Sequence, residues 1–565
     1  MPPIAPNPFV SHVLGAQTQP LLEETVGGLL QRIARQWPTH PALIAPAQGV
    51  RIDYATLDAV VTRLAAGLLA LGLESGDRIG IWSLNRAEWV LMQFASARAG
   101  LILVNINPAY RSHELEYALN TSGCRALVMA RRFKTSDYLA TLAELAPELP
   151  ASAPGQLHAA RLPHLRHVLL LGDEAALPGM WQFNDIARCR DAAALAHVDA
   201  LQATLYPNDA INIQFTSGTT GSPKGATLSH RNIVNNGYFI GEHMRLGPQD
   251  RLCIPVPFYH CFGMVLGNLA CVTHGSCMVV PGEGFDALAT LQTVADERCT
   301  ALHGVPTMFI ALLEHPRFSE FDLSTLRTGI MAGSPCPVEV MRQVVSRMHM
   351  DEVTIAYGMT ETSPVSFQTR PEDPMARRVD SVGRVHPHVE VRIVDEEGRP
   401  VPRGETGELH TRGYSVMRGY WGDAARTAEV LDADGWMHTG DLATLDGEGY
   451  CRIVGRLKDM LIRGGENIYP REIEEFLYTH PDVADVQVFG VPDEKFGEEI
   501  CAWIRLREGA RADADAIRQY CRERIAYYKV PRYVEFVQDF PMTITGKIQK
   551  YLMREEMARR LAGGG

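Results

Sequence analysis

The sequence predicts an α/β fold class, with a large N-terminal domain of layered helices and sheets that includes a small β-subdomain, and then a small α+β C-terminal domain. Three observations lead to this prediction. The length of 565 residues exceeds the size at which one hydrophobic core keeps growing. The composition, 46% hydrophobic and 21% charged, is typical of globular proteins. Apolar residues also alternate between helical and strand-like spacing along the chain.

Helical and strand-like segments follow one another through the first part of the chain. Leucines at helical spacing predict a helix over 57–72, and the alternation around Ile79 and Ile81 predicts a strand. The pattern continues in one helix and three strand-like runs, at 87–99, 101–104, 126–129 and 167–171. Short apolar strands between helices indicate sheets that helices cover.

The pattern changes twice in the second half. Alternating residues from Val389 onward, separated by turn-rich stretches, predict a β-subdomain over about 389–455. The final part reads as a compact α+β unit with two helices and a strand, at 473–477, 513–524 and 486–491. We therefore predict two domains, 1–457 and 458–565.

Charge and cysteine content exclude several classes of protein. The 54 basic and 66 acidic residues give a net charge of -12, which argues against a general nucleic-acid binder. The 11 cysteines include no C-x-x-C pair, so neither a zinc site nor a disulfide framework is expected. They fit buried thiols in a reducing compartment, and we expect a cytoplasmic protein.

The sequence gives no sign of a membrane span. The N-terminus lacks the basic and apolar regions of a signal peptide, and the most apolar stretch, 263–280, contains too many polar residues to cross a bilayer. Peripheral membrane contact remains open. The oligomeric state is also open, with a homodimer among the alternatives.

The strongest local pattern is TSGTTGSPKG at 216–225, between a strand-like run at 211–215 and a helical pattern that begins near Ser229. Its glycines allow close backbone approach, its hydroxyls donate hydrogen bonds, and Lys224 brings positive charge to an anion. A flexible surface loop is the alternative, although such loops rarely combine these features. Because Gly225 follows Lys224, this phosphate-binding loop is not of the Walker type.

This loop resembles the signature of the adenylate-forming superfamily, which includes acyl-CoA synthetases, the adenylation domains of peptide synthetases, and luciferases. Five more segments resemble that family's motifs in the family's order: YGMTET at 357–362, TGDL at 439–442, GRLKD at 455–459, GGENIYPREIE at 464–474 and PMTITGKIQK at 541–550. Segments 228–236 and 331–336 look most like medium-chain fatty acyl-CoA synthetases.

The resemblance implies an ATP-dependent acid–thiol ligase. In such enzymes a carboxylate attacks the α-phosphate of ATP, pyrophosphate leaves, and coenzyme A then displaces AMP from the acyl-adenylate. We expect a medium-chain fatty acid as substrate, ATP and coenzyme A as co-substrates, and Mg²⁺ as cofactor. Three alternatives stay open: another carboxylic acid (aromatic, branched or short-chain), a carrier protein loaded in trans, and a non-catalytic acyl or nucleotide binder.

The resemblance also assigns catalytic roles. Lys547 would bring an ammonium to the acyl oxygen and α-phosphate, an attraction of about 4 kcal/mol at about 4 Å for an effective dielectric near 20. Glu361 would hold Mg²⁺, and Thr360 would donate to a phosphate. The expected ATP and AMP contacts are Thr216, Ser217, Gly218, Thr219, Thr220, Gly221, Ser222, Pro223, Lys224, Gly333, Ser334, Pro335, Tyr357, Gly358, Asp441 and Arg456.

Within that set, Tyr357 would pack against adenine, Asp441 would accept both ribose hydroxyls, and Arg456 would add a second ribose contact. A structural ion pair is the alternative for Arg456. Taken alone, Lys547 could be a solvated surface lysine and Glu361 an exposed acid.

The remaining assignments concern the hinge and the two other substrates. Lys458 corresponds to the family's hinge, about which the C-terminal domain would move, and Gly464 and Gly465 would line the pantetheine path, with a simple tight turn as the alternative. The acyl pocket would include His260, Phe262, Val305 and Gly333. His260 could also act beside the acyl carboxylate, although a packed core histidine is an equal alternative.

Overall fold

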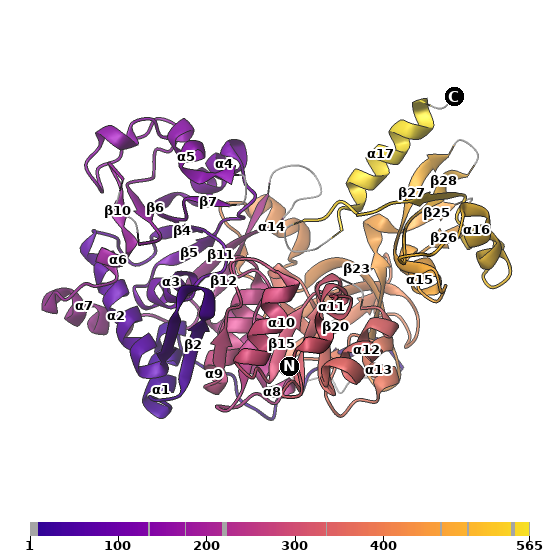
Figure 1. Cartoon of the computed structure of the whole chain (residues 1–565), viewed down its shortest axis with the longest axis horizontal. Helices are drawn as coiled ribbons and strands as arrows, with labels where there is room; N and C mark the ends of the chain where they lie inside the picture. The colour runs from indigo at the N-terminus through magenta and orange to yellow at the C-terminus, as the bar shows by residue number, and fades with distance from the viewer. Residues whose placement is uncertain are drawn as a thin grey trace.

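The computed structural model describes residues 9–133, 136–173, 175, 177–216, 223–334, 336–463, 466–493, 496–543 and 548–563. Figure 1 shows the chain from its indigo N-terminal helices to the yellow C-terminal helix α17 (Lys550–Gly563), which stands at the opposite end of the molecule. Four larger sheets organise the chain. Among the described residues, no helix has both the length and the apolar character that crossing a membrane requires.

The first sheet has 8 strands in the order β10-β9-β6-β4-β5-β11-β12-β22. Its strands from β10 to β11 run parallel, while β12 and β22 are antiparallel to their neighbours. The bounds are β4 Arg78–Trp82, β5 Ile102–Asn105, β6 Cys124–Met129, β9 His167–Leu170, β10 Trp181–Gln182, β11 Ala210–Thr216, β12 Lys224–Ser229 and β22 Gly419–Tyr420. The helices α2 (Tyr54–Ala70) and α3 (Ala87–Arg98) precede β4 and β5, so the expected alternation of helices and strands is confirmed.

The helix expected near Ser229 is confirmed, because Ser229 caps helix α8 (His230–His243). Strand β12, which lies between the predicted phosphate-binding loop and this helix, was not predicted. The loop therefore joins the two strands of an antiparallel hairpin, with Thr216 opposite Lys224. Residues 225–229 are all buried, and their alternation of apolar and polar residues covers only Ala226 to Ser229, too short a run to have revealed this strand.

The second sheet has 9 strands in the order β19-β18-β17-β16-β15-β13-β14-β2-β3, and its central strands run parallel. Its bounds are β2 Pro41–Ala45, β3 Val50–Asp53, β13 Arg251–Cys253, β14 Cys277–Val279, β15 Ala301–Gly304, β16 Thr328–Ala332, β17 Glu352–Gly358, β18 Val365–Gln368 and β19 Arg384–Val385. Apolar side chains of α10 (Ala287–Asp296), α11 (Pro306–Leu313) and α12 (Val338–Met348) pack in one cluster with this sheet.

The third sheet, of 5 strands, is the predicted β-subdomain with one addition. Its order is β1-β20-β21-β23-β24, with bounds β1 His12–Leu14, β20 Val389–Val394, β21 Gly407–Gly413, β23 Met437–Leu445 and β24 Cys451–Arg456. Strand β1 comes from the start of the chain and pairs antiparallel with β20, a long-range pairing that local periodicity does not reveal.

The fourth sheet lies in the orange and yellow part of Figure 1 and has its own buried cluster. Its strands are β25 Leu461–Arg463, β26 Glu466–Ile468, β27 Val483–Asp493, β28 Gly497–Leu506 and β29 Tyr533–Phe536, with helices α15 Pro470–Leu477 and α16 Ala514–Arg522. Helix α15 contacts β24: Arg471 donates to the Ile453 carbonyl at 2.9 Å, and Arg452 pairs with Glu475 at 3.1 Å. The boundary at Lys458 remains a prediction.

All 11 cysteines lie in described segments, and none forms a disulfide. The densest group, Cys253, Cys261, Cys271 and Cys277, is buried, as expected for small apolar side chains in a core.

Buried histidines predict a loss of stability in mild acid. Burial lowers the pKa of His230 to about 3 and the pKa of His243 and His303 to about 4. An unfolded histidine titrates near about 6.5, so below that pH the unfolded chain binds protons that the folded chain excludes. The free energy of unfolding should fall as pH drops from about 6.5 toward about 4, by about 2 kcal/mol per histidine at about pH 5.

Denaturant titrations at neutral pH and at about pH 5 measure this loss. The variant His303→Gln should show a smaller loss than the natural chain, whereas the exposed control His158→Gln should match it. Equal losses in all three proteins would contradict the assignment.

Candidate active site

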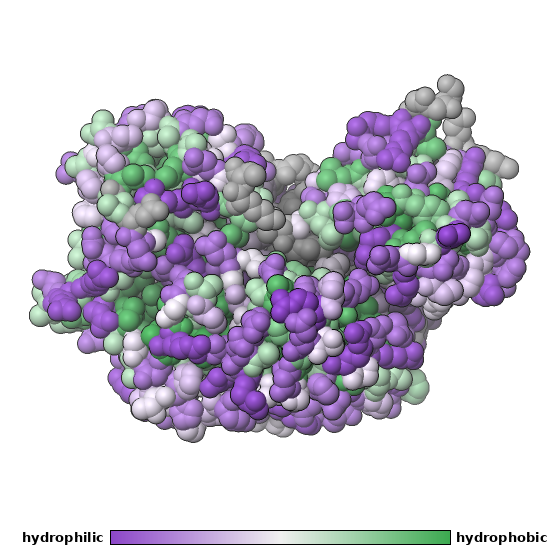
Figure 2. Space-filling model, viewed as in Figure 1, coloured by the Kyte–Doolittle hydropathy of each residue, from purple (hydrophilic) through white to green (hydrophobic). Residues whose placement is uncertain are grey.

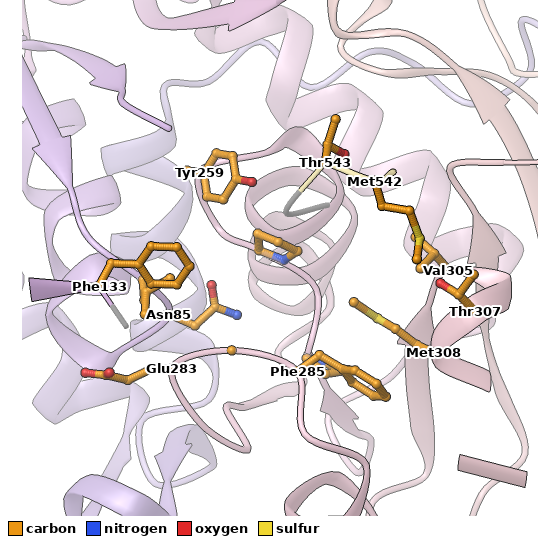
Figure 3. A pocket seen from close by; sticks show the side chains of 14 residues that line it. Asn85, Phe133, Tyr259, Glu283, Phe285, Val305, Thr307, Met308, Met542 and Thr543 are labelled. Atoms are coloured by element: carbon orange, nitrogen blue, oxygen red, sulfur yellow. The ribbon is translucent and has the colours of Figure 1, made fainter. Parts of the chain in front are cut away.

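A cavity of about 340 Å³ opens beyond the carboxyl ends of β4, β13 and β15. Figure 3 shows Phe133 and Asn85 on one side of it and Val305 and Met308 on the other. Met542 and Thr543, which come from the C-terminal part of the chain, also contribute to its wall. Loops after the carboxyl ends of parallel strands are a frequent place for ligand sites in α/β folds.

The surface in Figure 2 is hollowed between the lobe that carries α4 (Ser112–Ser122) and α5 (Tyr138–Leu145) and the C-terminal part of the chain. The residues that line the cavity come from distant parts of the sequence, from Leu84 to Thr543. Of the four residues predicted for the acyl pocket, Val305 lines the cavity, and His260 directly follows the lining residue Tyr259.

Phe262 and Gly333 are not among the residues that line the cavity. Phe262 is 6% exposed and packs against His303, with ring centroids 5.4 Å apart. Gly333 has a φ of +91°, and a Cβ there would lie 3.1 Å from a methyl group of Val305. Gly333 thus borders the cavity wall from behind. Neither residue needs to touch a ligand in the cavity to shape it.

The ring orientation of His260 is set by the backbone that follows it. Its Nδ1 accepts a hydrogen bond from the backbone N–H of Phe262 at 3.2 Å. In the neutral ring the proton therefore lies on Nε2, so His260 is a hydrogen-bond donor at Nε2 and not a base at Nδ1. The side chain is half-buried, which does not fit a fully packed core histidine.

Buried amides from the first sheet hold the segment that carries His260. Asn105 donates to the Tyr259 carbonyl at 2.9 Å, and Asn85 donates to the Val256 carbonyl at 2.9 Å. These bonds satisfy backbone groups that would otherwise be buried without partners. The π-helix Phe262–Leu269 follows, and π-helical turns are frequent at functional sites. Sequence patterns did not identify either asparagine, because neither belongs to a recognised motif and their partners are remote in sequence.

Three residues expected on the phosphate side meet in the structure. Thr216 and Lys224 face each other across the β11–β12 hairpin, and the Thr216 hydroxyl donates to Oε1 of Glu361 at 3.3 Å. Thr360 is buried beside Glu361, with its oxygen 3.9 Å from the sulfur of Cys261. Pro223 precedes Lys224, while Ser217, Gly218, Thr219, Thr220, Gly221, Ser222 and Pro335 lie outside the described residues.

The donor set around Glu361 fits Mg²⁺. Glu361 is 6% exposed and is the one carboxylate that contacts Thr216 among the described residues. Mg²⁺ in nucleotide sites takes one or two carboxylates and completes its shell with phosphate oxygens and water. A single carboxylate beside a phosphate-binding loop meets that requirement. Tyr420, which sequence reasoning missed, donates to the same Oε1 at 3.0 Å.

On the ribose side, Asp441 is bound at both oxygens. The Tyr357 hydroxyl donates to Oδ2 at 2.5 Å, and Nε of Arg456 lies 3.3 Å from Oδ1. Burial raises the pKa of Asp441, while Arg456 and Tyr357 oppose that rise. The structure therefore contains the ion pair that was the alternative for Arg456, and a ribose contact by this 56% exposed side chain remains a prediction.

Tyr357 and Gly358 end strand β17. Burial and the charge of Asp441 raise the pKa of Tyr357 well above its ordinary value, so its hydroxyl remains a donor. Gly358 allows two backbones to meet, because a Cβ there would lie 1.7 Å from the Pro364 carbonyl oxygen. Ser334 directly follows Gly333 and is half-buried.

The hinge and the C-terminal motif are described in part. The Lys458 side chain is exposed, yet partial loss of hydration around its ammonium, together with the charge of Arg456, lowers its pKa. Lys547, Gly464 and Gly465 lie outside the described residues. On either side of residues 544–547, Met542 and Ile548 form an antiparallel β-bridge, and the Gln549 N–H donates to the Pro541 carbonyl at 2.8 Å.

Comparison with known proteins identifies the family. The model described as AMP-binding enzyme matches residues 30–421, and that described as AMP-binding enzyme C-terminal domain matches residues 472–547. The chain belongs to the AMP-binding enzyme family. The resemblance to adenylate-forming enzymes that the motifs predicted is thereby confirmed.

Relatives of this AMP-binding enzyme extend over nearly its whole length. YngI of Bacillus subtilis (strain 168), whose name assigns it provisionally to the acyl-CoA synthetases, is 51% identical, with 95% of this chain and 97% of YngI covered. The mitochondrial medium-chain acyl-CoA ligase ACSF2 of Danio rerio is 47% identical, with 99% of this chain and 93% of the relative covered.

Among solved structures, the anthranilate CoA ligase AuaEII in complex with anthranoyl-AMP matches with a TM-score of 0.83 at 27% identity. The match covers 96% of this chain and 99% of that one. The predicted α/β class, with a large N-terminal part and a small C-terminal part, is confirmed.

We predict that Asp441→Asn weakens ATP binding by about 10- to 100-fold, because two ribose hydroxyls would lose a charged acceptor. Isothermal titration with ATP measures the change. The matched control is Asp373→Asn, which alters another buried carboxylate that accepts from a tyrosine, Tyr450, at 2.6 Å. Equal affinities in the Asp441 variant and the control would exclude the ribose role.

Proposed function

We propose that this protein is an ATP-dependent acyl-CoA ligase that converts a medium-chain fatty acid to its coenzyme A thioester through an acyl-adenylate, with release of AMP and pyrophosphate. Membership of the AMP-binding enzyme family and relatives named as acyl-CoA ligases support the reaction class. The observation that carries the proposal is a mostly apolar cavity whose wall includes Met542 and Thr543, the residues that lead into the segment of Lys547.

Each of the proposed site residues has a separate role in adenylation. Lys224 and the hydroxyls of the hairpin loop bind the phosphates, and Asp441 binds the ribose. Glu361 would hold Mg²⁺, which when bound neutralises negative charge on the phosphates. His260 donates from Nε2 toward the carboxyl group of the acid. Lys547 stabilises the charge that accumulates while the carboxylate attacks the α-phosphate and pyrophosphate leaves.

Cavity size and lining favour a medium-chain monoacid. A volume of about 340 Å³ is near the lower end for ligand pockets, which suits a short or medium chain better than a long one. Glu283 is the only charged side chain among the described residues that line it. A second carboxylate in the substrate would therefore meet no cationic partner there.

The second half-reaction requires a thiol to reach the acyl carbon. We propose that residues 458–565 move about Lys458 as one domain relative to residues 1–457, which withdraws Lys547 and brings Gly464 and Gly465 to the pantetheine arm. The separate buried cluster of the C-terminal part supports movement as a unit. Coenzyme A sulfur then attacks the acyl carbon, and AMP leaves.

We also propose a cytoplasmic location. Thiols without disulfide partners suit a reducing compartment. The vertebrate relatives, in contrast, are named as mitochondrial. Fractionation of cells that express the natural chain would separate the two locations.

We expect Lys547→Ala to lower the rate of ATP–pyrophosphate exchange by about 10²–10³-fold, as loss of a donor to developing charge does. The variant should still convert supplied acyl-adenylate to thioester at a nearly normal rate, because the lysine is withdrawn during that step. Equal losses in both half-reactions would refute the assigned role.

Chain length can be tested by filling the cavity. With acids from acetate to palmitate, we expect the highest kcat/KM near octanoate, and Met308→Trp should reduce kcat/KM for octanoate about 10-fold more than for butyrate. The control is Ile310→Trp on the same helix, whose side chain does not line the cavity. A flat response across all acids, with both variants alike, would count against this pocket.

A further inference from the structure

Tyr420 is a buried tyrosine outside the recognised motifs, and its side chain contacts both Glu361 and Lys224. It is 8% exposed and ends the short strand β22, where it pairs with Ala226 of strand β12. Strand β12 begins at Lys224. Residue 420 is thus placed next to the hairpin by sheet pairing, although it is remote from it in sequence.

The hydroxyl of Tyr420 fixes one oxygen of the Glu361 carboxylate. It donates to Oε1 at 3.0 Å, and the Thr216 hydroxyl donates to the same oxygen at 3.3 Å. Within the described ranges, no residue donates to Oε2. The carboxylate is therefore anchored through Oε1, which leaves Oε2 as the oxygen suited to a metal ion.

The ring of Tyr420 also contacts the predicted phosphate-binding lysine. Nζ of Lys224 lies over the ring, 5.1 Å from its centroid. An ammonium at that distance is attracted to the negative face of the ring. The Tyr420 side chain thus contacts both the carboxylate of Glu361, the predicted metal ligand, and the ammonium of Lys224, the predicted phosphate-binding group.

Backbone hydrogen bonds hold Tyr420 in this position. The N–H of Trp421 donates to the Gly225 carbonyl at 2.7 Å, and the N–H of Met417 donates to the Glu361 carbonyl at 2.8 Å. The N–H of Tyr420 itself donates to the Thr427 hydroxyl at 2.9 Å. The segment is therefore tied to the hairpin and to the 360–362 turn at once, which restricts the ring and its hydroxyl.

We propose that Tyr420 is a positioning residue that orients Glu361 for Mg²⁺ binding and sets the resting place of Lys224. This inference rests on the proposed function, in which Glu361 holds Mg²⁺ beside ATP. Partners that orient a metal ligand through a hydrogen bond usually change metal affinity by about 10- to 100-fold when they are removed. Tyr420→Phe removes the hydroxyl and keeps the ring, so it isolates the contact to Glu361.

The test measures binding, not turnover. Mn²⁺ is titrated into the full chain in the presence of a non-hydrolysable ATP analogue, and bound Mn²⁺ is read by electron paramagnetic resonance. We expect Tyr420→Phe to weaken Mn²⁺ binding about 10- to 100-fold, and to change affinity for the analogue without metal less than about 2-fold. The control Tyr450→Phe removes another buried tyrosine hydroxyl that donates to a carboxylate, and it should bind Mn²⁺ normally.

Two further variants keep the outcome clear. Thr216→Val removes the other donor to Oε1 without altering strand β22, and it should weaken Mn²⁺ binding in the same direction. Tyr420→Leu should in addition raise the KM for ATP, because Lys224 loses the ring. If Tyr420→Phe and Thr216→Val both bind Mn²⁺ normally while Glu361→Gln binds it weakly, the positioning role is overturned and the metal assignment stands. Normal binding by Glu361→Gln would overturn the metal assignment and this inference with it.

Discussion

The structure depends on hydrogen-bond partners for two buried carboxylates next to the place where ATP would bind in the proposed function. Moving a carboxylate out of water is costly unless hydrogen bonds or a positive charge compensate for the loss. Glu361 and Asp441 are 6% and 7% exposed, and each accepts a hydrogen bond from a tyrosine hydroxyl. The hydroxyls of Tyr420 and Tyr357 therefore supply hydrogen bonds of the kind that water donates to carboxylates at the surface.

Those pairings explain why the sheets must meet as they do. Tyr357 ends strand β17 of the second sheet, while Asp441 lies on β23 of the third, so the hydrogen bond between them joins the two sheets. Tyr420 belongs to the first sheet, and its partner Glu361 follows β17. The site is consequently a product of how three sheets pack, and a shift of one sheet would leave a buried acid without its donor.

Sequence patterns predicted the alternating helices and strands of the first part of the chain, because these elements follow local periodicity. They also led to the motif residues, because phosphate chemistry needs glycines, hydroxyls and lysine close together. They failed where a pattern is short or long-range packing decides. Strand β12 was missed because its alternation of apolar and polar residues is too short, and β1 because its partner lies almost 400 residues away, as in the pairing of His12 with Arg392. Tyr420, Asn85 and Asn105 belong to no recognised motif, since their roles come from hydrogen bonds to segments that are remote in sequence. The cavity wall at Phe133 and Met308 likewise follows from tertiary structure alone.

Met542 and Thr543 belong to the C-terminal part of the chain, yet they complete a cavity that the N-terminal part otherwise forms. An acid bound there, as in the proposed function, would touch both parts, so its binding energy would depend on the position of the C-terminal part. Coupling between the two equilibria is reciprocal. If withdrawal of the C-terminal part lowers the affinity for the acid by some factor, the bound acid disfavours withdrawal by the same factor. An acid that has not yet reacted would therefore favour the position of the C-terminal part in which Met542 and Thr543 complete the cavity.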